Sequence, residues 1–539
     1  MLSRELLLGL AAIITYLLFK VGDVRTLSVS WRQCAILKMR VKEKRKLVVK
    51  RQPSLLGGDS CRVITRPHIP SDESRIKALI EQVMALGEDE VLYVLDEVME
   101  GFAARHRNFR AILERNFERI AEYVPQQATL SSDQRLLLGA YFTQEYSVES
   151  AAFFNPAIVP HPDQEDVEDG SQRFIMSIRA TGEGHVSSIE FRSGIIDASN
   201  DMYFDPVSRY IATPEIHTDP VYDRLHFRRK LEEIGARDRV MNHLLEGLGE
   251  SFTFDELELQ IKKLRSTKFR LVDKQHAIDT ALWLARSNYE VIFRREEPIS
   301  ERVLFPVTEN ESSGIEDARF VRFVDDDGSV TYYATYTAYN GSDILPQILE
   351  TRDFLTFKFH TLSGDSVHNK GMALFPRKVN GQYVMLSRQD GVNNYIMFSD
   401  SLLFWNEAQL LQKPMHPFEF VQVGNCGSPV ETSTGWLALF HGVGPMRRYS
   451  IWAELLDLDD PSRVIGRMQE PILIPDEQER DGYVPNVVYS CGNMIHGDTL
   501  IIPYGIADQR CRVATASIPD LLSRLKASPQ LQLHLGRLR

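Results

Sequence analysis

The sequence predicts a mainly β protein with an N-terminal helical region and a helical insertion. First, short segments rich in β-branched and aromatic residues recur from residue 298 almost to the end, with turn residues between them. Second, no crossover helices separate these segments, which favours an antiparallel sandwich, barrel or propeller. Third, apolar residues follow the helical spacing in only two long stretches, residues 70–148 and 215–292.

The composition is ordinary for a globular protein. The 539 residues include 43% hydrophobic and 25% charged residues, enough for one large domain with additions. A net charge of −12 argues against a nucleic-acid partner. The five cysteines have neither metal-ligand spacing nor a disulfide framework, which fits a reducing compartment, so we expect a cytoplasmic protein.

The N-terminus leaves two interpretations open. The apolar run at residues 6–19 is short for a membrane-spanning helix, and no signal-peptide cleavage pattern follows it. Residues 1–38 are therefore either a membrane anchor or an incorrectly assigned start ahead of Met39. Residues 39–69 are expected to be a basic linker suited to an anionic lipid surface. Membrane contact is thus expected only if residues 1–51 are part of the mature protein.

The remaining elements follow in order. Ser71 and Asp72 are suitable caps for the helical region at 70–148, whose arginines alternate with glutamates as on a solvated face. Residues 150–525 are expected to form one β domain, interrupted by the helical insertion at 215–292. An insertion of this length is more often a lid or an interface element than a bare loop, so we expect it to border a binding pocket.

Several strand-end segments combine charged and polar residues with glycine. Each segment alone is explained by a local turn, but in a propeller such loops converge around one central depression. The segments are GIEDAR at 314–319, SVHNKG at 366–371, GNCGSP at 424–429, DGYVPN at 481–486 and YGIAD at 504–508.

Together these segments resemble glycoside hydrolase family 130, which contains β-mannoside phosphorylases and related mannosidases. The resemblance covers most of residues 150–525 and is carried by FFNPAIVP, GIEDARF, KGMALFPRKVNGQYVMLSRQD, GWLALFHGV and YGIAD, in that order. Ala318 stands where the family's GxEDPR segment has proline. The resemblance implies a five-bladed β-propeller.

The resemblance also implies roles for individual residues. Asp317 matches the family's general acid. The implied phosphate-binding residues are Lys370 and Arg388. The implied substrate-binding residues are Asn155, Arg179, Glu316, Asp508, His441 and Tyr449. No metal or organic cofactor is implied, because inorganic phosphate is itself the co-substrate.

The function implied is that of an inverting β-mannoside phosphorylase. Such an enzyme cleaves mannobiose or a manno-oligosaccharide with phosphate and releases α-mannose 1-phosphate. The protein supplies only an acid, because phosphate is the nucleophile. Asp317 must then be protonated near neutral pH, and we expect repulsion from Glu316 to raise its pKa.

Two alternatives stay open at this point. Glu431 stands where many phosphorylases have a lysine, and a carboxylate there favours a β-mannosidase that activates water. A non-catalytic carbohydrate-binding propeller is the other alternative, because a fold does not fix a function. The linkage, the acceptor sugar and assembly into a homo-oligomer are also open.

Overall fold

The computed structural model describes residues 47–217, 221–233, 236 and 238–527. The expected anchor or incorrect start at 1–38, and residues 39–46 of the expected linker, lie outside the described residues. The chain divides into residues 1–48 and residues 49–539, and the architecture below is that of the second unit. Among the described residues, no helix combines the length and the apolar character needed to cross a membrane.

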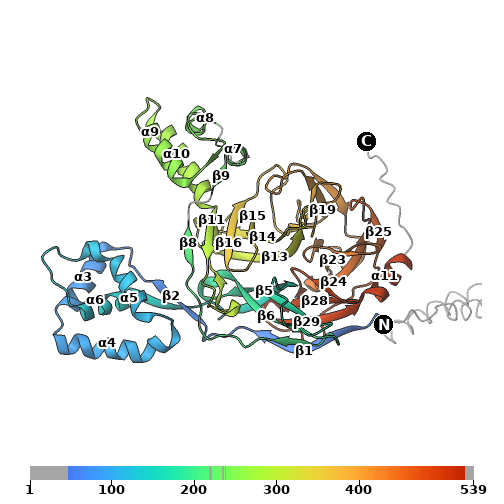
Figure 1. The fold of residues 1–539 in the computed structure, drawn as a ribbon, viewed down its shortest axis with the longest axis horizontal. Helices are drawn as coiled ribbons and strands as arrows, with labels where there is room; N and C mark the ends of the chain where they lie inside the picture. Colours follow the sequence, from blue (N-terminus) through green and yellow to red (C-terminus); the bar gives the residue numbers. More distant parts are fainter. Residues whose placement is uncertain (1–46, 218–220, 234–235, 237, 528–539) are drawn as a thin grey trace, which may run out of the picture. The chain divides into compact units, whose positions relative to one another are not determined.

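The protein is mainly β, as predicted, and its strands form antiparallel groups that follow one another along the chain (Figure 1). The first group is β4 (Ala152–Pro160), β5 (Gln172–Thr181), β6 (Ser187–Ile196) and β7 (Met202–Phe204), with β12 (Val303–Leu304) added to β6. The second is β13 (Gly314–Val324), β14 (Val330–Tyr339), β15 (Ile344–Thr351) and β16 (Thr356–Thr361). A single parallel residue pair, Gly314 with Ser187, joins these two groups.

The later groups have the same antiparallel order. The third is β17 (Ala373–Leu374), β18 (Tyr383–Ser387), β19 (Asn394–Ser399) and β20 (Ala408–Gln412). The fourth is β21 (Gln422–Asn425), β22 (Val430–Thr432), β23 (Gly435–Val443), β24 (Tyr449–Leu456) and β25 (Val464–Arg467). The last is β26 (Val488–Tyr489), β27 (Met494–His496), β28 (Thr499–Ile506) and β29 (Arg510–Ser517), followed by helix α11 (Ile518–Ala527).

The last group is completed by a strand from the other end of the chain. Strand β1 (Val49–Gly57) pairs antiparallel with β29 from Val49 with Ala516 to Gly57 with Arg510, with a register shift between Arg51 and Leu55. The Arg51 guanidinium also contacts the buried Glu479 carboxylate, with both N–O distances at 3.1 Å. Residues 49–57 of the expected linker at 39–69 are therefore part of a sheet, and their side chains alternate between a more buried and a more exposed face of that sheet.

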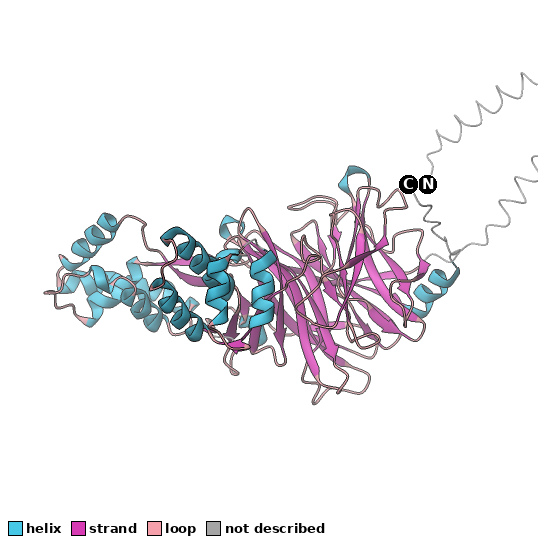
Figure 2. Cartoon of the chain, turned by 90° about the horizontal axis from the view of Figure 1, so that it is seen from above, coloured by secondary structure: helices cyan, strands magenta, loops and turns pink. Residues whose placement is uncertain are grey.

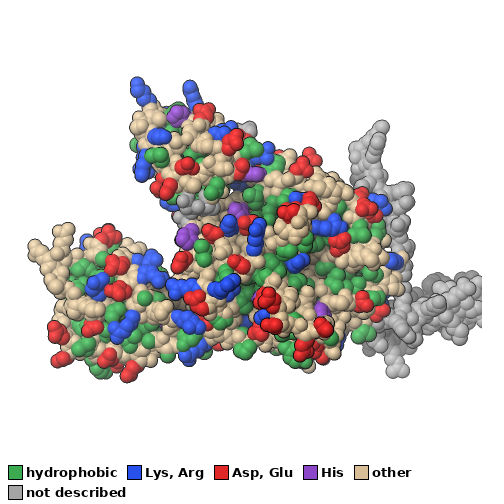
Figure 3. Space-filling model, viewed as in Figure 1, with side chains coloured by type: hydrophobic (Ala, Val, Ile, Leu, Met, Phe, Trp, Pro, Cys, Tyr) green, Lys and Arg blue, Asp and Glu red, His purple; other side chains and the backbone are tan. Residues whose placement is uncertain are grey.

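The N-terminal helices are carried on a two-stranded ribbon of β2 (Val63–Pro67) and β3 (Thr143–Ser147). Between these strands lie α3 (Glu73–Met84), α4 (Glu88–Phe102), α5 (Phe109–Glu118) and α6 (Ser132–Tyr141). Asp72 caps α3, because its side chain accepts a hydrogen bond from the Ser74 amide. The helices have their own apolar core, which includes Ile80 and Leu137. On the face shown in Figure 3, acidic and basic side chains are intermingled over these helices and over the helical insertion.

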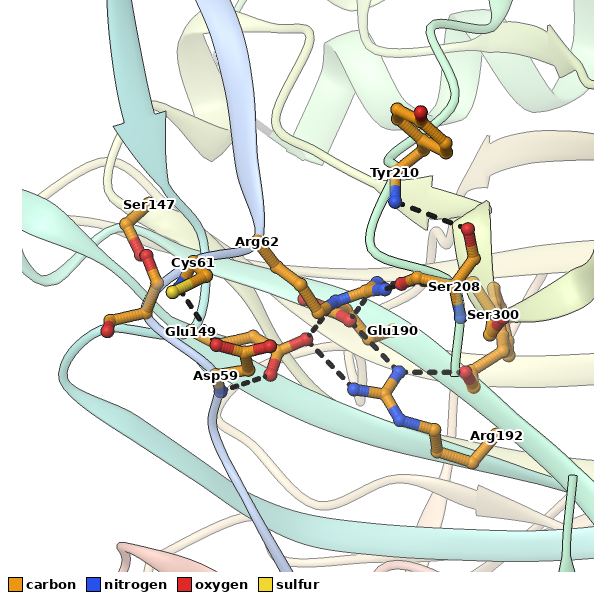
Figure 4. Close-up of polar contacts among 12 residues, drawn as sticks. Asp59, Cys61, Arg62, Ser147, Glu149, Glu190, Arg192, Ser208, Tyr210 and Ser300 are labelled. Carbon is orange, nitrogen blue, oxygen red and sulfur yellow. Dashed lines mark hydrogen bonds and ion pairs between the residues drawn. The ribbon is translucent and has the colours of Figure 1, made fainter. Parts of the chain in front are cut away.

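A buried group of four charges anchors the base of this ribbon (Figure 4). Glu149 Oε1 accepts from Arg62 Nε at 2.6 Å and from Arg192 Nη2 at 2.9 Å. Glu190 Oε2 accepts from Arg62 Nη2 at 2.9 Å and from Arg192 Nη1 at 3.1 Å. All four side chains are at most 5% exposed, so this charge quartet is compensated internally rather than by water.

The second helical part begins and ends at the edge of the second strand group. Strand β11 (Tyr289–Ile292) pairs with β16 on one side and with β8 (Glu215–His217) on the other. Between β8 and β11 lie β9 (Tyr222–Asp223), α7 (Arg224–Glu233), α8 (Arg239–Glu246), β10 (Ser251–Phe252), α9 (Phe254–Arg265) and α10 (Leu271–Arg286). Their apolar side chains form a separate core. Figure 2 distinguishes the helices from the sheets by colour.

Candidate active site

Two predicted residues lie at irregularities of otherwise regular strands. The pairing of β4 with β5 shifts register between Phe154 and Ala157, and that of β13 with β14 shifts between Glu316 and Arg319. Asn155 and Asp317 lie within these irregularities with φ values of 51° and 54°. A bulge with a left-handed residue turns a side chain away from the direction that strand alternation would give it. The FNP and GIEDAR segments thus place an amide and a carboxylate where regular strands would not.

Five of the predicted site residues form one network of direct contacts. Asp317 Oδ1 accepts from Asn155 Nδ2 at 2.7 Å and from Arg179 Nη1 at 3.1 Å. Glu316 accepts from Arg179 Nη2 at 2.8 Å through Oε1 and from Lys370 Nζ at 2.6 Å through Oε2. Charge-assisted contacts of this kind hold the side chains in defined positions.

Arg319 is a further member of the site, to which the sequence analysis gave no role. Arg319 is buried, with 3% of the residue exposed. Its Nη1 donates a hydrogen bond to the Asp317 carbonyl oxygen at 3.2 Å. Nη2 donates to the Tyr489 hydroxyl at 2.7 Å, and Nε donates to Asn425 Oδ1 at 3.2 Å. The sequence signal was present, because Arg319 ends the GIEDAR segment and Tyr489 follows the DGYVPN segment.

The sequence analysis expected Asp317 to be protonated near neutral pH with a raised pKa, and this expectation is wrong for the arrangement that the structure shows. Burial acts to raise the pKa of Asp317, but Arg179, Arg319, the Asn155 amide and Lys370 outweigh it and lower the pKa to about 2. Glu316 was expected to raise the pKa of Asp317 by repulsion between the two negative charges. Arg179 and Lys370 both bind the Glu316 carboxylate, so its negative charge is compensated. Asp317 is therefore ionised at neutral pH in this arrangement.

Asp508 behaves in the opposite way. It follows β28 with φ of 50°, and its side chain is half-buried. Burial and the negative charge of Asp317 raise the pKa of Asp508 to about 6, against the opposing effects of Arg179 and Arg447. The site thus contains two nearby carboxyl groups whose pKa values differ strongly, which is typical of sites that handle protons.

His441 and Tyr449 lie together beside the network. The His441 ring is buried, with its centroid 5.7 Å from that of Tyr449 and 4.8 Å from that of Tyr489. Burial, Arg388 and Arg319 hold the pKa of His441 well below its ordinary value, so the ring is neutral. Within the described part of the chain, neither ring nitrogen has a hydrogen-bond partner.

Arg388 lies in the same region. The Cβ of Arg388 is 4.0 Å from the position that a Cβ at Gly371 would occupy, so it is adjacent to the residue that follows Lys370. Its Nε is buried and has no partner among residues 47–217, 221–233, 236 and 238–527. The structure therefore brings Arg388 to His441 and the Lys370 segment, but it forms no hydrogen bond to Asp317 in the described residues.

Glu431, the residue that favoured a hydrolase, lies away from this region. Glu431 pairs with Trp436 across β22 and β23, whereas His441 pairs with Gly424 across β21 and β23. Five residues of strand separate these two positions, roughly 17 Å. The Glu431 carboxylate is bound by the Arg377 guanidinium, with both N–O distances at 2.7 Å. Glu431 is thus not available to activate water beside Asp317.

Comparison with known proteins identifies relatives that are similar in sequence to this chain. A family model described as beta-1,4-mannooligosaccharide phosphorylase matches residues 281–527. A 1,2-beta-oligomannan phosphorylase from Thermoanaerobacter sp. (strain X514) is 37% identical over 228 residues, covering 41% of this chain and 75% of the relative. A beta-1,2-mannobiose phosphorylase from Listeria innocua is 30% identical over 290 residues, covering 50% of this chain and 79% of the relative.

A solved structure of the Listeria innocua beta-1,2-mannobiose phosphorylase, in complex with beta-1,2-mannobiose, aligns with a TM-score of 0.42 and 22% identity, over 71% of this chain and 94% of that chain. The family-model match includes the segments that carry Asp317, Lys370 and Arg388. On the extent and identity of these matches, the chain belongs to glycoside hydrolase family 130.

Proposed function

We propose that this protein is an inverting β-mannoside phosphorylase, which cleaves mannobiose or a manno-oligosaccharide with inorganic phosphate and releases α-mannose 1-phosphate. The observation that carries this proposal is the direct network that joins Asp317 to Asn155 and Arg179, and Glu316 to Lys370. One acid beside fixed cations is what phosphorolysis requires, because phosphate supplies the nucleophilic oxygen. Sequence relatives named as mannoside phosphorylases support the same activity.

In the proposed reaction, a phosphate oxygen forms a bond to the anomeric carbon while the glycosidic C–O bond breaks. The electron pair of that bond goes to the leaving oxygen, which gains the proton of Asp317, passed through a sugar hydroxyl. Inversion converts the β-mannoside into an α-phosphate. Lys370 and Arg388 hold the phosphate, because a guanidinium and an ammonium provide fixed positive charge.

The remaining predicted residues hold the sugar. Asn155, Arg179, Glu316 and Asp508 are proposed to bind the mannosyl unit, and His441 and Tyr449 to make further phosphate or sugar contacts. Arg319 is proposed to fix the backbone of Asp317, because it donates to the Asp317 carbonyl oxygen. No metal or organic cofactor takes part in this proposal.

The low pKa of Asp317 has a consequence for this mechanism. Asp317 is ionised because cations surround it, and a bound phosphate brings negative charge to the same cations. Phosphate binding therefore raises the pKa of Asp317 towards the value that a general acid needs near neutral pH. Phosphate is thus proposed to prepare the acid as well as to supply the nucleophile.

The five antiparallel groups of the described strands are proposed to be the blades of a five-bladed β-propeller. Support comes from their sequential order and from β1, which adds an N-terminal strand to the C-terminal group. This arrangement brings strand ends from every group around one axis. Residues 150–525 would then be the catalytic domain, with 70–148 and 215–292 as helical additions.

Product analysis tests the proposed activity. β-1,2-Mannobiose and β-1,4-mannobiose are each incubated with and without inorganic phosphate, and the products are separated. We expect mannose 1-phosphate only in the presence of phosphate, and a loss of about 100-fold or more in kcat for Asp317→Asn, because a general acid contributes on this scale. Equal cleavage in phosphate-free buffer, or an unaffected D317N variant, would contradict the proposal.

A further inference from the structure

Helix α7 of the insertion has two distinct faces. Phe227 and Leu231 point into the core shared with α8, α9 and α10. A second face of the helix carries His226, Arg229 and Glu233, because residues spaced three and four apart lie on the same side of a helix. This second face is not part of the core of the insertion.

The second face of α7 contacts two loops of the third strand group. Glu233 Oε1 accepts a hydrogen bond from the Gly364 amide at 2.5 Å. The other two contacts join His226 Nε2 to Ser401 Oγ at 3.0 Å and place the Arg229 guanidinium 4.2 Å from the Phe404 ring centroid. Three residues of one helix face thus contact residues 364 and 401–404.

These two loops are hydrogen-bonded to each other. Residues 363–371, called here the Lys370 loop, bind residues 403–405 through Ser363 N to Leu403 O at 2.9 Å and Trp405 N to Ser363 O at 2.7 Å. Gly364 has φ of 118°, and a Cβ there would lie 2.0 Å from the Trp405 carbonyl oxygen. Gly364 thus packs directly against the Trp405 backbone, with no room for a side chain, and its amide donates a hydrogen bond to Glu233.

The Lys370 loop leads directly to both proposed phosphate-binding residues. Lys370 lies six residues after Gly364, and its Nζ contacts Glu316 at 2.6 Å. The carbonyl oxygen of Ser366, in the same loop, accepts from Gln389 Nε2 at 2.9 Å. Gln389 follows Arg388 in the sequence. Six residues of chain thus connect Gly364 to Lys370, and one hydrogen bond connects the same loop to the residue beside Arg388.

We propose that Glu233 is a positioning residue, through which the helical insertion fixes the Lys370 loop and so sets the affinity of the site for phosphate. This inference rests on the proposed phosphorylase function. It assigns the insertion a role in holding one co-substrate, whereas the sequence analysis expected only that the insertion borders a binding pocket.

Steady-state kinetics of the full chain tests this role, with phosphate and the mannobiose that the wild type cleaves varied in turn. For Glu233→Ala we expect the KM for phosphate to rise roughly fivefold or more, the usual range for coupling between sites. The KM for the mannobiose should change less than about twofold. Glu258→Ala, at an exposed position on α9, is the matched control and should leave both constants unchanged.

Two further variants separate positioning from general loss of structure. Glu233→Gln keeps an oxygen that accepts from the Gly364 amide, so it should retain the wild-type KM for phosphate. Glu233 also lies 3.2 Å from the buried Lys230 Nζ, so E233A is repeated with Lys230→Met to remove the unpaired charge. The increase in the KM for phosphate should persist in that double variant.

The outcomes are distinguishable. An unchanged KM for phosphate in Glu233→Ala overturns the inference, and so does a parallel loss of kcat and of both substrate affinities with a lowered melting temperature. A wild type that cleaves the mannobiose without phosphate overturns the proposed function instead. A selective rise in the KM for phosphate, with rescue by E233Q, supports the positioning role.

Discussion

At the scale of single residues, the motifs selected side chains that lie in contact, but they did not predict the electrostatics of these side chains. The five residues Asn155, Arg179, Glu316, Asp317 and Lys370 were selected from four separate segments, and the structure joins them by direct contacts. The pKa of Asp317 was expected in the wrong direction, because the positions of the surrounding cations are not visible in a linear motif. The bulges at Asn155 and Asp317 were also hidden, since their segments resemble ordinary strands.

The depressed pKa of Asp317 predicts a pH-dependent contribution to stability. A carboxylate whose folded pKa is about 2, against an ordinary 3.8, stabilises the fold above its unfolded pKa and loses this contribution as pH falls through the folded value. Wild type should therefore exceed Asp317→Asn in free energy of unfolding by about 2 kcal/mol at pH 7. The difference should shrink between about pH 4 and pH 2.

Urea unfolding of both proteins at pH 7, 5, 4 and 3 measures this difference. Carboxylates distant from Asp317 titrate in the same range, but their contributions are common to both proteins and largely cancel in the comparison. Asp508 does not cancel, because the charge of Asp317 raises its pKa. A difference that stays constant down to pH 3 would show that the surrounding cations do not stabilise the ionised Asp317.

At the scale of elements, local patterns predicted the helices better than they predicted long-range strand pairing. The helical region at 70–148 and its Asp72 cap were visible in spacing and residue type. Strand β1 was not, because its basic sequence is typical of a linker and its partner β29 lies more than four hundred residues away. The charge quartet was equally hidden, since Arg62, Glu149 and Glu190 come from three separate segments.

The quartet predicts a large penalty for removing one of its charges. Arg62→Met leaves two buried glutamates with only Arg192, and breaking a buried pair in this way costs about 3–5 kcal/mol in free energy of unfolding. The double variant Arg62→Met with Glu149→Met keeps one arginine and one glutamate, so its cost should be less than the sum of the two single costs.

Chemical denaturation of the two single variants and the double variant gives this coupling energy. Arg110→Met, at an exposed position on α5, is the control and should change the free energy of unfolding by less than about 0.5 kcal/mol. Strict additivity of the two single costs would show that Arg62 and Glu149 do not depend on each other.

At the scale of the whole molecule, the pairing of β1 with β29 connects the two ends of the β domain. If the five strand groups form a closed ring, weakening the group that contains β1 must destabilise every other group in one transition. Arg51→Met tests this, because it leaves the buried Glu479 with fewer compensating contacts, namely Arg512 and the Tyr504 hydroxyl. Trp436 and Trp452, in the fourth group, report on a part of the sheet that Arg51 does not contact.

Tryptophan fluorescence, in a background where Trp31, Trp283 and Trp405 are replaced by phenylalanine, and far-ultraviolet circular dichroism are therefore followed together during urea unfolding of Arg51→Met and of Lys50→Met. Lys50 is 61% exposed in its side chain and pairs with the half-exposed Asp201, so its loss should cost less than about 1 kcal/mol. Arg51→Met should shift both signals equally to lower urea, because a closed ring unfolds as one unit. Two separated transitions would mean that the fourth group is stable without the closing strand, and that the strand groups do not depend on one another as blades of one ring.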